Sequence, residues 1–138
     1  MNGVPIAFRF GLTGRRWGEP GPVALLVHGR DAAPRGLAEL VAGLVAAGRQ
    51  VIALDDPSEP GAAEPARTAE LAAAIVEAAV ELRALESIVA HGRGAAAAAQ
   101  ALTQGLDAER AVLLARDLDC GADVLDQLVE RGRLPLAA

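Results

Sequence analysis

The sequence lacks lysine and tyrosine altogether, and it contains one cysteine and only three aromatic residues, Phe8, Phe10 and Trp17. The single cysteine, Cys120, excludes a disulfide within the chain and is typical of a reducing compartment, so we expect a cytoplasmic protein. All 13 cationic side chains are arginine, and they form no basic stripe interleaved with aromatic residues. We therefore expect no nucleic-acid partner.

Long hydrophobic runs are also missing. No apolar stretch reaches the roughly 18 residues that a transmembrane helix needs, and residues 1–5 lack the pattern of a secretory signal, so we expect no membrane partner. Small and aliphatic residues are abundant: 52% of the chain is hydrophobic, the mean hydropathy is +0.29 and the net charge is −5. For 138 residues this composition predicts a single domain over residues 1–138 with a core of Ala, Val and Leu.

Apolar residues follow two alternating patterns along the chain. Continuous apolar runs predict buried strands, and apolar positions spaced by three and four residues predict amphipathic helices. We expect strands over residues 4–10, 12–17, 23–27, 50–54, 87–90 and 111–115, helices over residues 34–47, 64–83 and 94–104, and a last amphipathic stretch with Val124, Leu125, Leu128 and Val129. This alternation predicts an α/β fold, a three-layer sandwich with a mostly parallel sheet and an N-terminal antiparallel hairpin.

The segment with the most functional information is residues 87–99. A β-branched run ends at His91-Gly92-Arg93-Gly94 and passes into an alanine-rich helix. This strand–turn–helix arrangement is where α/β proteins place a nucleophile or bind a phosphate. The frame of a nucleophile elbow is present, but its central position is Gly92, which has no side chain.

Four motifs occur in the order found in the α/β-hydrolase family, and the chain resembles that family over about residues 15–118. An apolar strand leads into His28-Gly29, a second strand ends in a turn at residues 55–57, the elbow follows at residues 90–94, and another strand follows at residues 109–115. The resemblance implies a truncated α/β-hydrolase-like domain, similar to the N-terminal two-thirds of the family's core. It also implies an oxyanion hole made by the backbone N–H groups of Arg30 and Arg93.

The catalytic residues of that family are not matched. Gly92 occupies the nucleophile position and no histidine follows His91, whereas hydrolysis needs a nucleophile and a base within hydrogen-bond reach. We therefore assign no catalytic residue and predict an inactive homologue that needs no cofactor and no metal ion. A helix N-terminus favours an anion. The predicted ligand is a small anion at the remnant oxyanion hole, bound by Gly29, Arg30, Gly92, Arg93 and Gly94.

Three other interpretations remain open. One is an active ester or acyl hydrolase whose missing groups come from another chain or from unusual positions such as Asp56 or Asp117. A second is a nucleotide-binding module, since Gly92-x-Gly94-x-x-Ala97 fits the dinucleotide fingerprint and Asp117 follows Ala97 by about twenty residues. A third is a metal site of side chains at the carboxyl ends of neighbouring strands, namely His28, Asp55, Asp56 and His91.

The last predicted strand, over residues 111–115, lies at an edge of the predicted sheet. An open edge is a template for pairing with another chain. The apolar stripe over residues 124–129 adds a hydrophobic surface to the same part of the chain. We therefore expect a homodimer or another partner at this edge.

Overall fold

The computed structural model describes residues 3–27, 34–57 and 61–114. Within these ranges the elements follow one another as β1 (Val4–Ala7), η1 (Arg9–Gly11, a 3-10 turn), β2 (Thr13–Trp17), β3 (Val23–Val27), α1 (Pro34–Ala46), β4 (Gln50–Leu54), α2 (Glu64–Leu82), β5 (Leu85–His91), α3 (Arg93–Thr103) and β6 (Ala108–Leu114). The amphipathic stretch predicted around residues 124–129 lies outside the described residues.

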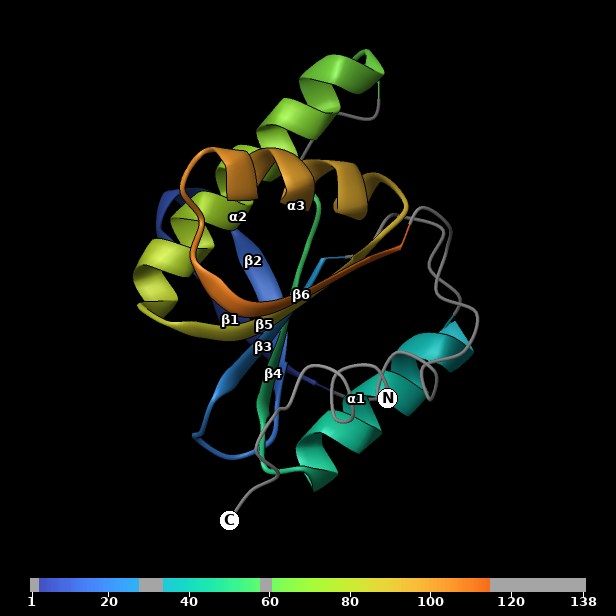
Figure 1. The fold of residues 1–138 in the computed structure, drawn as a ribbon, viewed down its shortest axis with the longest axis vertical. Coiled ribbons are helices and arrows are strands. Elements are labelled where there is room, and N and C mark those ends of the chain that lie inside the picture. Colours follow the sequence, from blue (N-terminus) through green and yellow to red (C-terminus); the bar gives the residue numbers. More distant parts are fainter. Residues whose placement is uncertain (1–2, 28–33, 58–60, 115–138) are drawn as a thin grey trace.

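One six-stranded sheet runs through the molecule in the order β1-β2-β4-β3-β5-β6. Strands β4, β3, β5 and β6 are parallel to one another, whereas β1 pairs antiparallel with β2 and β2 pairs antiparallel with β4. Helix α1 covers one face of the sheet, and α2 and α3 lie together on the other (Figure 1). The predicted α/β sandwich, with its mostly parallel sheet and N-terminal hairpin, is thereby confirmed.

Two apolar clusters fill the spaces between these layers. The larger cluster joins the sheet to α2 and α3 and includes Leu25 and Ile75, and the smaller one joins the sheet to α1 and includes Leu26 and Leu44. Successive residues of a strand point to opposite faces. Leu25 and Leu26 thus point to opposite faces of the sheet, and both are buried because helices cover both faces. This explains why β3 is a continuous apolar run in the sequence.

Three predicted strands have wrong boundaries. The first strand ends at Ala7 instead of residue 10, because Phe10 adopts a left-handed conformation (φ 62°) within the 3-10 turn. Strand β5 covers residues 85–91 instead of 87–90, and β6 begins at residue 108 instead of 111. These two strands extend because they pair in parallel along their whole length, which no local pattern reveals. The remaining described elements differ from the prediction by at most one residue at either end.

The partner expected at the edge of the sheet stays a prediction. Strand β6 lies at the edge of the sheet that the described residues form, and the partner expected there is not part of the structure. None of the described helices is both long enough and apolar enough to cross a membrane. The cytoplasmic location expected from the cysteine content also stays a prediction.

Candidate functional site

The carboxyl ends of β3 and β5 mark the point where the chain changes the face of the sheet that it covers. The two strands are neighbours, but the helix that follows β3 is α1 on one face, and the helix that follows β5 is α3 on the other (Figure 1). In open α/β sheets, ligands bind in the crevice outside the carboxyl ends of the strands at such a switch point. The topology therefore places the turn between β5 and α3 where a ligand is expected.

Gly92 forms the sharp turn from β5 into α3. Its backbone angles are φ 58° and ψ −132°, a combination that residues with a side chain adopt only under strain. The N–H of Ala95 donates a hydrogen bond to the carbonyl oxygen of Gly92 at 3.1 Å, which closes the first turn of the helix. The turn thus has the strained strand-to-helix geometry of a nucleophile elbow, with no side chain at its tip.

Gly94 allows α3 to lie directly against the end of β3. A Cβ atom at this position would overlap the carbonyl oxygen of Val27 and would lie 2.9 Å from its carbonyl carbon. In a dinucleotide fingerprint, by contrast, the second glycine lets the backbone approach a pyrophosphate. Because the space at Gly94 is filled by the protein itself, this geometry does not favour the nucleotide-binding interpretation, whose acidic residue Asp117 lies outside the described residues.

Arg93, the first residue of α3, forms an ion pair with Asp56, which follows β4. Its Nη1 donates to Oδ2 of Asp56 at 3.1 Å, and the two side chains are 17% and 6% exposed, respectively. Since β3 lies between β4 and β5, the pair links the segments that follow the two neighbours of β3. Both residues were expected near the carboxyl ends of strands, but their contact was not predicted.

Two residues of the predicted anion site, Gly29 and Arg30, lie outside the described residues. The oxyanion hole expected from the backbone N–H groups of Arg30 and Arg93 therefore stays a prediction. Ser87 is fully buried in β5, five positions before the turn at Gly92, so its hydroxyl is not presented at the elbow.

The structure places three of the four residues considered for a metal site. His91 is 2% exposed at the end of β5, Asp56 is paired with Arg93, and the carboxylate of Asp55 accepts a hydrogen bond from Oγ1 of Thr13 at 2.7 Å. Within residues 3–27, 34–57 and 61–114, no group of three or more His, Cys, Asp or Glu side chains is placed to hold a metal ion. The fourth residue, His28, lies outside these ranges.

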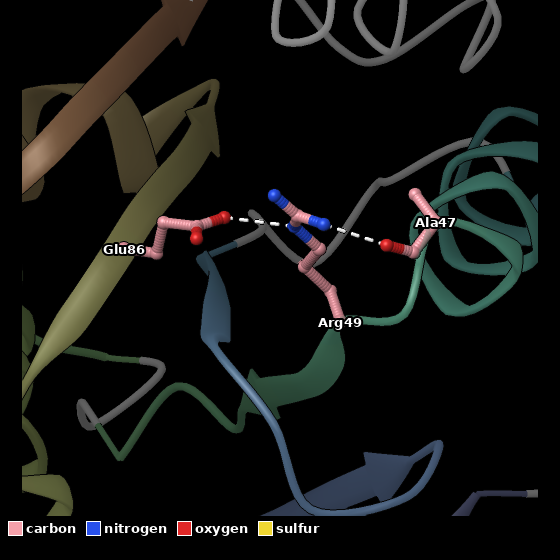
Figure 2. Close-up of polar contacts among 3 residues, drawn as sticks. All are labelled: Ala47, Arg49 and Glu86. Atoms are coloured by element: carbon pink, nitrogen blue, oxygen red, sulfur yellow. Dashed lines mark hydrogen bonds and ion pairs between the residues drawn. The ribbon is translucent and has the colours of Figure 1, made fainter. Parts of the chain in front are cut away.

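A second ion pair, which is buried, lies at the amino ends of β4 and β5. Nε of Arg49 donates to Oε1 of Glu86 at 2.8 Å, and its Nη1 donates to the carbonyl oxygen of Ala47 at 2.6 Å (Figure 2). The two side chains are 1% and 8% exposed. This pair was not predicted, because Glu86 lies outside the strand expected over residues 87–90, whereas in the structure it is the buried second residue of β5.

Comparison with known proteins identifies the fold. No family model and no curated protein matches the sequence. Among solved structures, an epoxide hydrolase from Vigna radiata superposes with a TM-score of 0.62 at 19% identity, covering 80% of this chain and 38% of that one. The thioesterase domain from the curacin biosynthetic pathway superposes with a TM-score of 0.60 at 27% identity, covering 83% of this chain and 45% of that one.

A third match is a protein that is itself described as an α/β-hydrolase. It is an epoxide hydrolase of the α/β-hydrolase superfamily from metagenomes of hot environments, with a TM-score of 0.57 and 24% identity. It is covered over 41% of its length, so this chain spans less than half of each of the three proteins. Together with the sheet order and the elbow geometry, these matches show that the chain has the α/β-hydrolase fold.

Proposed function

We propose that this chain is a non-catalytic protein of the α/β-hydrolase fold that binds a small anion at the turn between β5 and α3. The observation that carries this proposal is the conformation of Gly92. It has the strained backbone of a nucleophile elbow at the switch point of the sheet, yet it presents no group that can attack a substrate. The backbone turn of an elbow without its nucleophile can therefore serve as a binding site for a ligand.

The groups next to Gly92 suit an anion. The first N–H groups of an α-helix have no acceptor within the helix, and the helix dipole adds a partial positive charge at the same end. Arg93 brings a guanidinium to this end of α3, and hydrogen bonds between charged partners are about twice as strong as neutral ones. By the resemblance to hydrolases, Gly29 and Arg30 supply the second side of the pocket. The ligand class that fits these donors is a carboxylate or a phosphate.

We expect phosphate to bind reversibly with a Kd of about 1 mM, which corresponds to about 4 kcal/mol. The measurement is a phosphate titration of the isotope-labelled protein followed by NMR, in which the amide signals of Gly92, Arg93 and Gly94 shift and saturate together. The variant Arg93→Gln should weaken binding at least about tenfold, because it removes a charged hydrogen-bond donor worth about 1.5–3 kcal/mol. The matched control is Arg16→Gln on an exposed residue of β2, which should bind phosphate like the parent protein.

If these three amide signals show no saturable shifts at phosphate concentrations far above the expected Kd of about 1 mM, the proposed ligand class is overturned. Equal weakening by both arginine variants would show that phosphate responds only to the overall charge of the protein.

We expect neither the parent protein nor the variant Gly92→Ser to hydrolyse p-nitrophenyl acetate faster than buffer. A serine at the elbow restores the nucleophile, but hydrolysis also needs a base within hydrogen-bond reach. His91, the nearest histidine along the chain, is buried at the end of β5. The assay compares initial rates with those of the heat-denatured proteins. Turnover by the parent protein would instead support the active hydrolase that obtains its missing groups from another chain or from positions such as Asp56.

A further inference from the structure

The surface between η1 and the C-terminal end of α2 is hollowed, and two exposed apolar side chains line the hollow. Phe10 comes from η1 and Val80 from α2, and they are 84% and 72% exposed, respectively. No other large hydrophobic side chain in the described ranges is as exposed as these two. Exposed apolar side chains that lie singly are ordinary, whereas apolar side chains that gather around a hollow are typical of an interaction site.

The turn that carries Phe10 is fixed against the rest of the protein. Phe8 and Leu12, which flank η1, are buried in the larger apolar cluster, and the N–H of Phe8 donates a hydrogen bond to the carbonyl oxygen of Leu12 at 2.8 Å. The N–H of Arg9 donates to Oε2 of Glu81 on α2 at 3.0 Å. The exposed aromatic ring is therefore carried by a turn that is held at both ends and tied to the helix beside it.

The same hollow contains the two non-glycine residues with positive φ in the described ranges. Phe10 has φ 62°, and Arg83, which follows the last residue of α2, has φ 72°. This conformation is disfavoured for residues with a side chain, and glycine adopts it just after α1 and α3, at Gly48 and Gly105. Because backbone strain persists mainly where a side chain has a function, both residues indicate that this surface has one.

The charges around the hollow are of both signs. Arg9 and Arg83 supply two guanidinium groups, and Glu77 and Glu81 supply two carboxylates. Among the residues that the structure describes, no ion pair joins one of these four side chains to another. A small ligand with one charge would meet two like charges here. A second copy of the same surface carries both signs and can place each charge opposite its complement.

We propose that this η1–α2 surface, made of Arg9, Phe10 and side chains of residues 76–83, binds a second copy of the chain. A twofold interface joins the same patch of two molecules, so the patch has to be complementary to itself. Here Phe10 of one copy enters the hollow beside Val80 of the other, and Arg83 pairs with Glu77 of the other copy. Since η1 joins β1 and β2, at the opposite end of the strand order from β6, this interface is separate from the open edge of β6.

Sedimentation equilibrium of the full chain tests the interface through exchanged charges. We expect a reversible dimer with a Kd on the order of 100 µM, because two short elements present less surface than an interface of standard size. Arg83→Glu and Glu77→Arg should each weaken the dimer at least about tenfold, because each brings like charges together. The double variant should return the Kd to within about threefold of the parent value, because the pair is present again with its signs exchanged.

The matched control for these charge changes is Glu70→Arg, on an exposed position of α2 outside the hollow. It should change the Kd less than about twofold, because a charge outside the contact is screened by salt. Equal weakening by Glu70→Arg and Glu77→Arg would overturn the proposed pairing, and so would a double variant that is as weak as the single ones.

Two further variants separate a role in binding from a role in folding. Glycine adopts a positive φ freely, and asparagine tolerates it better than most residues. Arg83→Gly and Phe10→Asn should therefore unfold in urea at the same or a higher concentration than the parent, measured far below the Kd, while each weakens the dimer at least about tenfold. Less stable variants that dimerise like the parent would show that both side chains serve the fold and would overturn the interface.

Two other results would also overturn it. One is a parent protein that stays monomeric up to about 1 mM, roughly ten times the expected Kd. The other is a dimer that Phe10→Asn leaves intact and that Leu113→Lys, on an exposed position of β6, abolishes, because the contact would then lie at the edge of the sheet.

Discussion

Replacing Gly94 by alanine is expected to lower the free energy of unfolding by about 3 kcal/mol. A Cβ atom at this position would overlap the carbonyl oxygen of Val27 and lie 2.9 Å from its carbonyl carbon. Both atoms belong to the backbone of β3, which is buried and paired on both sides, so they cannot move aside cheaply. Overpacking of this kind costs about 1–3 kcal/mol and sometimes more. That cost exceeds the gain in helix propensity from glycine to alanine, which is at most about 1 kcal/mol.

Unfolding in urea measures this effect, and Gly61→Ala is the matched control. Gly61 has no atoms within 4 Å of a Cβ built on it, so the same substitution there should change the free energy by less than about 0.5 kcal/mol. A Gly94→Ala protein as stable as the parent would mean that α3 does not lie against Val27. Because the same contact sets the start of α3, a folded Gly94→Ala protein should also bind phosphate less well.

The second large effect is expected for Arg49→Leu, which should lower the free energy of unfolding by about 3–5 kcal/mol. Arg49 and Glu86 are both buried and are joined at 2.8 Å (Figure 2). Removing one member of a buried ion pair leaves the other charge in a low-dielectric environment without compensation. The arginine also donates to the carbonyl oxygen of Ala47, a hydrogen bond that leucine cannot replace.

The partner variant and the double variant show whether the loss comes from the pair. Glu86→Leu should cost about as much as Arg49→Leu, whereas replacing both residues by leucine should cost far less than the sum, because an apolar pair can substitute for a buried ionic one. Arg16→Leu, on an exposed position of β2, is the control for losing an arginine and should stay within about 0.5 kcal/mol of the parent. Strictly additive losses in the double variant would mean that the two side chains do not interact.

The features that were predicted correctly are those encoded in short stretches of the chain. Apolar runs such as residues 23–27 and the three- and four-residue spacing in residues 37–45 depend only on which neighbours share a face, so the strands, the helices and the fold class followed from them. The elbow was located at residue 92 for a similar reason, because a strand, a small-residue turn and a helix succeed one another within a few positions. The wrong boundaries at Ala7, Leu85 and Ala108 all depend on turn conformation or strand pairing.

In the proposed anion site, too, some features follow from residue type and others depend on tertiary packing. That Gly92 carries no nucleophile is a property of the residue type and was evident at once. The backbone angles of Gly92 depend on how α3 lies against the sheet. The same packing brings the backbone of Val27 close to Gly94. The partner of Arg93 was not predicted, because a local pattern cannot show which of several aspartates near the strand ends will reach it.

The order of the strands explains why neither ion pair was predicted. Asp56–Arg93 and Arg49–Glu86 join residues 37 positions apart in the sequence. The separation is the same because β4 and β5 run parallel on the two sides of β3, and one pair links them at each end. The order of amino acids was enough for an α/β fold with a glycine at a strand–turn–helix elbow, since periodicity and turn chemistry act between near neighbours, and the resemblance of four motifs added the α/β-hydrolase family. The charges that face that elbow were set by the packing of β4, β3 and β5 side by side, which brings distant residues into contact.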